Sequence, residues 1–430
     1  MGEMKMKPEP DLREIAVATI RDTWRSYPSE SLTPGKLARI LKEADAGDIY
    51  RQMELFEELE EKDCHIFSCL QTRKLAVANR AWDILPAGDR RADRKMADFA
   101  KEVIWGIENW QSALTDMLDA IGKGFSVLEI MWEIKNSQVQ IGELKWVHQK
   151  NFTFDDTLQL RLITEDEPIK GIKLPPAKFV IHTYKAKSGI LARGGVVRIV
   201  SWMYIFKHFD IKDWITFAEI FGMPLRVGKY PPGASKEDKK ILMQAITQLG
   251  TDAAGIIPDT MIIDFIEAVK GTSVNVYETL AGFCNVEISK AILGQTLTVE
   301  VGNVGSYAAS KTHENVREDL VEADAKALQN TIDKQLIKPL IDFNFGPQKV
   351  YPHFKIHYEP PEDLKSLAER DAILARIGVK IPVRYFYKKY DLPEPEEGEE
   401  VLEPVVAMKD LAEEAIALKK KLTFLKKSTG

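Results

Sequence analysis

Residues 291–306, with the sequence AILGQTLTVEVGNVGS, separate two helical patterns and decide how the rest of the chain is interpreted. The first pattern ends at Ile292, Leu293 and Gly294. The residues that follow include two further glycines, and Glu300 is their only charged side chain. Small and polar residues of this kind are typical of exposed loops rather than core strands. The sequence therefore predicts an exposed loop over residues 295–305.

A long helix is expected after this loop, because apolar residues recur there every three to five positions. These residues are Val316, Leu320, Ala323, Ala327, Ile332 and Leu336. The pattern predicts a helix from Ser306 to Lys338, with Pro339 at its end. Such a helix would be roughly 50 Å long, at about 1.5 Å per residue. It would need other long elements or neighbouring subunits to pack against.

Two more long helices are predicted before the loop, over 197–221 and 274–293. The first is dense in aromatic residues, namely Trp202, Tyr204, Phe206, Phe209, Trp214, Phe217 and Phe221. Such a helix is covered nearly all round, either inside a core or at a subunit interface. Between the two helices, residues 225–263 read as a small module of one helix, over 235–249, and short strands, the last over 261–263.

The remaining chain predicts an α+β fold of long helices and small antiparallel sheets. Residues 49–78 read as one helix that leads into a strand at 81–86, and helical and strand patterns alternate up to Trp132. Short strands joined by turns follow over 136–184. After Pro347 one strand, over 350–359, precedes a helical and lysine-rich end.

Size and charge leave several classes of partner open. The chain has 430 residues, 45% of them hydrophobic, and a formal net charge of −6, so it can form two to four compact units. It lacks the bulk basic charge of proteins that bind nucleic acid tightly. DNA passing through a channel would favour a weakly attractive wall, because many phosphate contacts would hold it.

Targeting and cysteine signals are weak. The first residues lack the apolar core of a signal peptide, and no run of about 18 apolar residues occurs, so we expect a protein made in the cytoplasm without a membrane partner. The three cysteines, Cys64, Cys69 and Cys284, form no paired CxxC motif. We therefore expect neither a disulfide nor a zinc site.

Motifs of catalysis are missing from the sequence. It contains no P-loop, Rossmann glycine motif, HExxH helix or GxSxG turn. His353 and His357 are four residues apart but have no third ligand nearby. No catalytic residue, cofactor or metal site is predicted, and an enzyme acting on nucleic acid is the weakest hypothesis.

Three polar or basic groups have two readings each. The basic group of the central module comprises Arg226, Lys229, Lys236, Lys239 and Lys240, which fit a solvated face or a contact with DNA or a partner. The polar residues of the loop fit either an inert connection or a surface that slides past phosphates without fixing them. The C-terminal lysines, which alternate with leucines, fit a partner-binding helix or a solvated tail.

Four segments together resemble one known family. They are RAWDI at 80–84, GKGFSVLEIMW at 122–132, the helix from Trp202 to Pro224 that ends in FGMP, and ISKAILGQTLT at 288–298. They occur in family order over roughly residues 70–360. In these segments the chain resembles the portal proteins of tailed phages, in particular the Mu-like branch.

The resemblance implies a ring, commonly of twelve subunits, at one vertex of the phage head, through which double-stranded DNA is pumped in and later leaves. In this reading residues 1–46 are an N-terminal arm, 47–195 and 311–360 the wing, 196–222 and 272–294 the stem helices, 223–271 the clip, 295–310 the tunnel loop and 361–430 the crown.

The resemblance also implies partners and site residues. The partners would be further copies of the chain, DNA, the large terminase subunit, major capsid and scaffolding proteins, and head–tail connector proteins, in a virion assembled in the host cytoplasm. The stem interface would comprise Trp202, Phe206, Phe209, Trp214, Phe217 and Phe221, and the basic group of the clip would dock the packaging motor. The tunnel loop would line the DNA channel with Gln295, Thr296, Thr298, Glu300, Asn303 and Ser306.

Two other functions compete with this reading. A head-completion or adaptor protein of the virion would share the oligomeric habit without needing a clip between two long helices. A nucleic-acid-processing enzyme would need a carboxylate cluster or nucleotide loop that the sequence does not supply. Glu300, where a basic residue would grip phosphate, argues against tight DNA binding by the loop.

Overall fold

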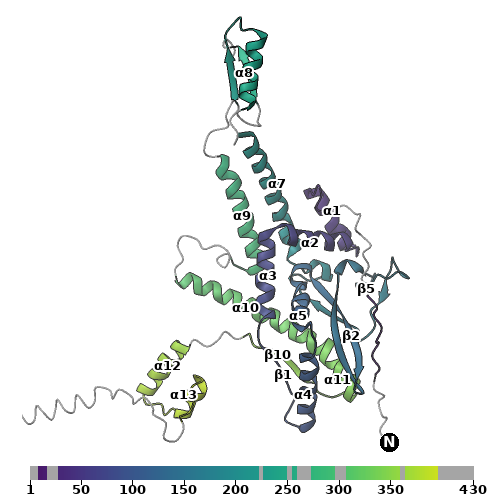
Figure 1. The fold of residues 1–430 in the computed structure, drawn as a ribbon. Helices are drawn as coiled ribbons and strands as arrows, with labels where there is room; N and C mark the ends of the chain where they lie inside the picture. The colour runs from purple at the N-terminus through teal and green to yellow at the C-terminus, as the bar shows by residue number, and fades with distance from the viewer. Residues whose placement is uncertain are drawn as a thin grey trace, which may run out of the picture. The chain divides into compact units, whose positions relative to one another are not determined.

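The computed structural model describes residues 8–16, 28–221, 226–248, 254–258, 273–295, 307–358 and 364–395. Contacts divide the chain into two units, residues 1–359 and 360–430. The first unit holds the expected antiparallel sheets and long helices (Figure 1).

A three-stranded antiparallel sheet forms the centre of the first unit, in the order β3-β2-β7. The strands are β2 (Phe125–Lys135), β3 (Gln138–Val147) and β7 (Phe179–Thr183). Side chains of β2 alternate between two cores: Leu128 and Ile130 enter one, and Phe125 and Val127 enter the other. Because both faces are covered, the strand is a nearly continuous apolar run.

Smaller strands surround this sheet. A second antiparallel sheet joins β4 (Phe152–Phe154), β5 (Leu160–Leu162) and β6 (Ile172–Lys173). The strand predicted after the second helix is β1 (Trp82–Leu85), and it pairs with β10 (His353–Ile356). This pair joins residues 82–85 to residues 353–356, two segments that are separated by more than half of the chain.

The helix predicted over 49–78 is two helices, α2 (Tyr50–Lys62) and α3 (Cys64–Ala78), so the continuous prediction was wrong. The break is at Asp63, whose backbone is extended. Its carboxylate accepts hydrogen bonds from the backbone N–H groups of His65, at 2.9 Å, and Ile66, at 3.1 Å. This is an N-cap, which satisfies donors at the start of α3 and lets the chain turn there.

Four further helices frame the central sheet. α1 (Pro34–Asp45) lies beside α2, and α4 (Arg91–Trp105), α5 (Trp110–Leu118) and α6 (Ala120–Lys123) lead into β2. The turn from α6 to β2 needs a glycine. Gly124 has φ +95°, and a Cβ there would lie 2.1 Å from the carbonyl oxygen of Leu191.

The described part of the N-terminal arm, residues 8–16, lies against the central sheet. The backbone N–H groups of Ile15 and Ala16 donate to the carboxylate of Glu129, at 2.7 and 2.8 Å. Glu129 is buried and also pairs with the buried Lys178, at 3.2 Å. The arm therefore supplies two hydrogen bonds to the buried carboxylate of Glu129.

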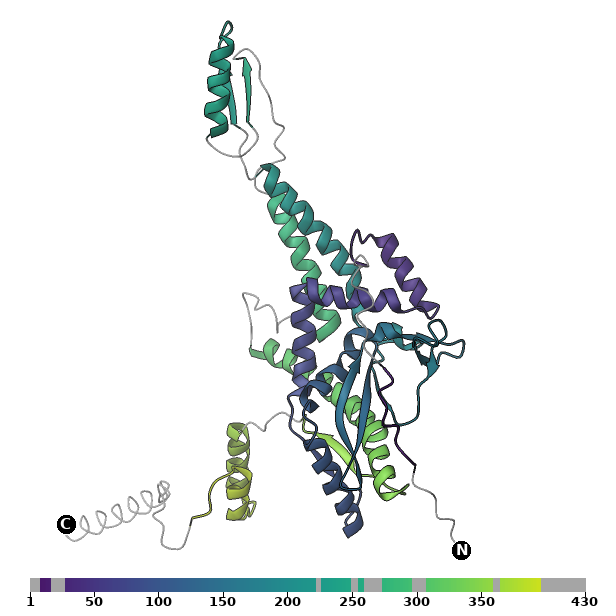
Figure 2. The ribbon, with the colours of Figure 1, turned by 45° about the vertical axis from the view of Figure 1, so that its right-hand side comes forward.

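The two long helices predicted before the loop are α7 (Val197–Phe221) and α9 (Ser273–Leu293). They lie side by side along most of their length (Figures 1 and 2). The residues of α7 nearest the sheet, Val197, Val200 and Ile205, are buried in the larger core. No described helix carries an apolar stretch long enough to cross a bilayer.

The helix after the loop does not end at Pro339, which corrects the prediction. α10 (Tyr307–Ile332) continues through a π-helical turn (Asp333–Ile337) into α11 (Lys338–Phe345). Pro339 is the second residue of α11 and follows directly after the π turn. The wider π turn accommodates the proline, and the helix ends at Gly346 with φ 75°.

The module between the long helices contains β8 (Arg226–Tyr230), α8 (Lys236–Gln248) and β9 (Ala254–Pro258), and β8 and β9 are parallel. The strand predicted at 261–263 lies outside the described residues. The second unit contains α12 (Leu364–Arg376) and α13 (Val383–Lys389). The buried Asp371 of α12 accepts a hydrogen bond from the hydroxyl of Tyr390, directly after α13, at 3.0 Å, which joins the two helices.

Candidate functional site

The pair of helices α7 and α9 exposes large apolar side chains along both members. On α7, Phe206 is 46% and Ile215 is 56% exposed, and on α9, Phe283 is 55% exposed. Five further apolar side chains of the two helices are also exposed, namely Ile199, Phe209, Ile211, Val276 and Leu280. Apolar side chains grouped in this way mark a surface that a partner covers.

The predicted interface residues divide into three groups. Phe206 and Phe209 are exposed, and Trp202 is half-buried against the larger core. Trp214 and Phe217 pack on Tyr277 of α9 in the same chain, with ring centroids 6.4 and 5.8 Å apart. Their rings thus also hold the helix pair together.

The side chain of Phe221, the last of the predicted interface residues, lies outside the described residues. The exposed side chains of α9 were missed by the sequence reasoning, which considered the aromatic residues of α7 alone. The signal that could have found them is the helical spacing of Val276, Leu280 and Phe283, three to four residues apart.

Ion pairs fix the base of α7 to the body. Lys207 donates to both oxygens of the buried Asp63, at 2.9 and 3.0 Å. Arg198 bonds to Gln52 and pairs with Asp45 at 2.9 Å. Because Asp63 also caps α3, the helix pair is tied directly to the break between α2 and α3.

The predicted DNA-facing loop begins where α9 ends. Gly294 has φ +68°, a left-handed conformation that often ends helices. The side chain of Gln295 is buried in the single chain, at 4% exposure, and its place on the wall of a DNA channel stays a prediction. The other five predicted loop residues, Thr296, Thr298, Glu300, Asn303 and Ser306, lie outside the described residues.

The basic residues of the central module lie on one small unit. Lys229, Lys236 and Lys240 are exposed, whereas Lys239 lies over the ring of Tyr230, 4.5 Å from its centroid. The side chain of Arg226 lies outside the described residues. The exposed Ile241 and Met243 on the same helix α8 make this surface both basic and apolar.

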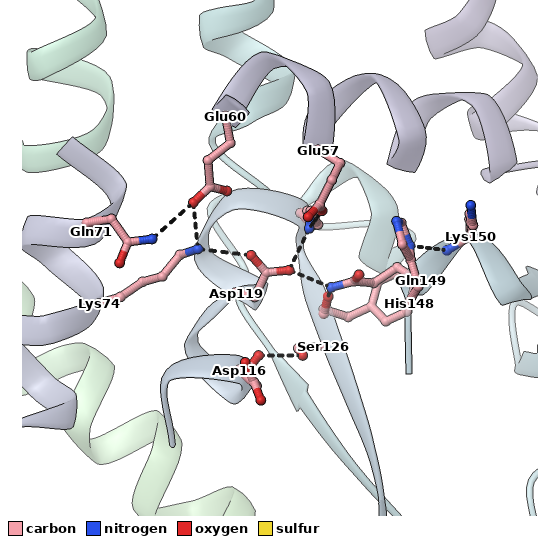
Figure 3. Close-up of polar contacts among 12 residues, drawn as sticks. Glu57, Glu60, Gln71, Lys74, Asp116, Asp119, Ser126, His148, Gln149 and Lys150 are labelled. Carbon is pink, nitrogen blue, oxygen red and sulfur yellow. Dashed lines mark hydrogen bonds and ion pairs between the residues drawn. The ribbon is translucent and has the colours of Figure 1, made fainter. Parts of the chain in front are cut away.

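A buried ionic cluster joins α2, α3 and α6, and sequence reasoning missed it entirely (Figure 3). The carboxylate of Asp119 accepts from Lys74 at 3.0 Å and from Gln149 at 2.9 Å, and it pairs with Lys123 at 2.8 Å. Glu60 binds Lys74 at 2.9 Å, and Glu57 binds Lys123. Each buried ammonium group therefore has two carboxylate partners.

The carboxylates and ammonium groups of this cluster each stabilise the charged form of their partners. Burial would raise the pKa of Asp119, but the ammonium groups of Lys123 and Lys74 hold it well below its usual range. Burial would lower the pKa of Lys123, but Asp119 and Glu57 keep it above its usual range. Asp116 differs, since burial and the nearby Asp119 raise its pKa to about 6.

The cluster borders a cleft of about 660 Å³ that also contains Phe67 and Trp146. The charged groups of the cluster are paired with one another, as in a structural network, rather than arranged as a nucleophile with a base. Within the described ranges, no three His, Cys, Asp or Glu side chains converge as metal ligands would.

Comparison with known proteins gives consistent matches. The family model for the portal protein of Mu bacteriophage matches residues 53–392. The portal protein of Escherichia phage Mu is 34% identical over 406 residues, which cover 92% of this chain and 78% of that protein. The Mu-like prophage FluMu protein gp29 of Haemophilus influenzae (strain ATCC 51907 / DSM 11121 / KW20 / Rd) is 35% identical over 396 residues, which cover 88% and 74%.

A solved structure supports the fold. A chain in the virion of a native gene transfer agent particle aligns with a TM-score of 0.51 at 10% identity, covering 77% of this chain and 91% of that one. The matches confirm the resemblance and the portal fold inferred from the sequence. The chain belongs to the family of Mu bacteriophage portal proteins, a family of structural proteins.

Proposed function

We propose that this portal protein assembles through α7 and α9 into a ring at a capsid vertex, and that double-stranded DNA is packaged and ejected through the ring. The observation that carries the proposal is the row of exposed apolar side chains on both helices, among them Phe206, Ile215 and Phe283. A closed ring covers such a row on every subunit with the next copy.

The energetics favour a second copy as the occupant of this surface. Full burial of one Phe or Ile side chain stabilises by about 1.5–3 kcal/mol, and these side chains are about half exposed. Several of them lie on two antiparallel helices that pack side by side, so their combined burial offsets part of the cost of association. A neighbour that presents the same helix pair supplies a matching apolar surface.

In this proposal α7 and α9 are the stem, and residues 226–258 belong to the clip that docks the packaging motor and later the connector proteins. The exposed Lys229, Lys236 and Lys240 would meet acidic groups of the motor, and Ile241 would supply an apolar contact. Residues 47–195 and 311–360 would be the wing, which contacts capsid and scaffolding proteins, and 361–430 the crown.

The ring is proposed to act as a conduit without catalysis of its own. The large terminase subunit would hydrolyse ATP, and residues 296–306 would lie along the DNA path. The formal charge of −6 suits a path that DNA must leave as well as enter, because a strongly basic wall would retain it. The proposed location is the portal vertex of a virion assembled in the host cytoplasm.

The experiment substitutes aspartate into the exposed row. Phe206→Asp and Phe283→Asp are expected to reduce ring yield at least tenfold while the subunit stays folded, because a charge at the centre of an apolar interface costs about 1.4 kcal/mol or more. Ile169→Asp is the matched control, since Ile169 is 84% exposed and lies far from the helix pair in sequence. Normal rings from both stem variants would contradict the proposed interface.

A further inference from the structure

Helix α3 holds both helices that flank residues 296–306. It contacts the last turns of α9 and a stretch of α10, and all three helices meet at the lower end of the α7–α9 pair (Figures 1 and 2). At the first contact, His65 lies 2.7 Å from the hydroxyl of Ser289 in α9. The following contacts come from Arg73 on α3 and from Arg80, which lies two residues beyond the end of α3.

Arg73 joins α9 to α10. One guanidinium nitrogen donates to the backbone carbonyl of Ile292 at 2.7 Å, at the end of α9, where carbonyls lack helical partners. Its Nε and its other terminal nitrogen bind both oxygens of Asp324 in α10, at 2.8 and 3.1 Å. Arg73 and Asp324 are each 5% exposed. The hydroxyl of Tyr184, directly after β7, accepts a further hydrogen bond at 3.1 Å, so the guanidinium has partners on α9, on α10 and next to β7.

Arg80 makes the second contact with α10. It binds both carboxylate oxygens of Glu318 at 3.1 Å. Unlike the Arg73 pair, this pair is partly open to solvent, with side-chain exposures of 24% and 25%. Its Nε also donates to the carbonyl of Ala76 within α3, at 3.2 Å, which orients the guanidinium.

Both arginines contact the middle of α10. Arg73 lies on α3 and Arg80 lies two residues beyond its end at Ala78, and their partners Asp324 and Glu318 lie six residues apart on α10. Six residues correspond to about 9 Å along a helix. α3 is itself held by Lys74, which pairs with Glu60 and Asp119.

We propose that Arg73 and Arg80 are positioning residues for DNA passage: they fix the end of α9 and the middle of α10 to α3 and to the turn that follows it. A load applied between α9 and α10 is then carried by α3 and its ion pairs rather than by separation of α9 from α10. This inference rests on the proposed function, since it assigns a role in DNA translocation to a contact outside the DNA path.

The Arg80–Glu318 pair is the better place for a test. Because it is partly exposed, its loss changes stability little, whereas loss of Arg73 would leave Asp324 buried without its partner. The variants are Arg80→Glu, Glu318→Arg and the double charge swap. Lys326→Glu is the control, because Lys326 lies on the same helix but its partners are Glu322 and the ring of Tyr358 rather than a residue of α3 or the turn after it.

Capsids assembled with each variant are supplied with terminase, ATP and DNA, and the DNA protected from nuclease is measured per ring. Each single variant is expected to lower protected DNA about fivefold at normal ring yield, the double swap to restore it, and Lys326→Glu to leave it unchanged. If charge reversal lowers ring yield, Arg80→Gln replaces it with the same expectation per ring.

Two results would overturn the inference while the wild-type ring packages DNA: single variants that package at the wild-type level, or a double swap that packages no better than the singles. A wild-type ring that packages no DNA would instead contradict the proposed function. The two failures are therefore distinguishable in one experiment.

Discussion

Asp116 and Asp119 should respond in opposite ways to the same substitution. Asp119 belongs to the buried ionic cluster, and Asp116 lies three residues before it (Figure 3). Asp119 binds two ammonium groups and a side-chain amide, whereas no side-chain partner is found for the carboxylate of Asp116 in the described part of the chain. Asparagine removes the charge from either residue with little change in shape.

The expected change in the free energy of unfolding for Asp116→Asn follows from the pKa of Asp116, which is raised from 3.8 to about 6. A folded pKa above the unfolded one means that ionisation at neutral pH opposes folding, by up to about 3 kcal/mol for a shift of this size. Because the side chain is partly open to the cleft, we expect Asp116→Asn to raise the free energy of unfolding by about 1–2 kcal/mol.

The stability gained by Asp116→Asn should depend on pH. The gain from Asp116→Asn should be complete above about pH 6, fade as the pH falls through the interval between the two pKa values, and vanish below about pH 4, where Asp116 is protonated in both states. Asp119→Asn should instead lower stability by about 3–5 kcal/mol, because it removes a shared partner of two buried lysines.

The loss from Asp119→Asn should have a different pH profile. The depressed pKa of Asp119 makes its contribution present above the unfolded value of 3.8 and lost only as the pH falls well below it. Thermal unfolding of the full chain at about pH 7.5 and about pH 4, at equal protein concentration, measures both effects, with about 1 °C per kcal/mol for a chain of this length. A fall in the midpoint for Asp116→Asn at neutral pH would refute the reasoning, since it would mean that the Asp116 carboxylate is stabilised in the folded chain.

Three further substitutions test separate parts of the structure. Gly294→Ala should lower the free energy of unfolding by about 1–2 kcal/mol in denaturant titration, because φ is +68°; an unchanged midpoint would argue against that conformation. Arg73→Met should cost about 3–5 kcal/mol, most of which the added Asp324→Leu should restore; a double variant no more stable than the single would contradict a buried pair. Trp214→Ala should lower both the unfolding midpoint and the ring yield, because the ring stacks on Tyr277 within the helix pair; loss of ring yield alone would place Trp214 purely at the subunit interface.

The elements with a local signal were predictable from the sequence. α7 begins and ends at the predicted residues, because the break at 222–224 and the glycines before Val197 punctuate it. β1 and the antiparallel strands of 136–184 also agree, since alternation of apolar residues depends only on neighbours in sequence.

The errors come from residues whose role depends on distant partners. Asp63 reads as one more charge on a helix, and only its pairing with Lys207 and its cap on α3 reveal a break. Pro339 reads as a helix end, but the preceding π turn carries the helix past it. The buried cluster joins Glu57 to Gln149 through Asp119, so no local pattern could have placed these groups together.

The measurement that tests the central claim most directly is electron microscopy of the purified chain with mass determination by light scattering. The account predicts closed rings of about twelve copies of the 48.7 kDa chain, with a central hole wide enough for duplex DNA and with α7 and α9 at the subunit contacts. A discrete monomer or dimer across the accessible concentration range would contradict it, as would rings whose α7 and α9 face solvent.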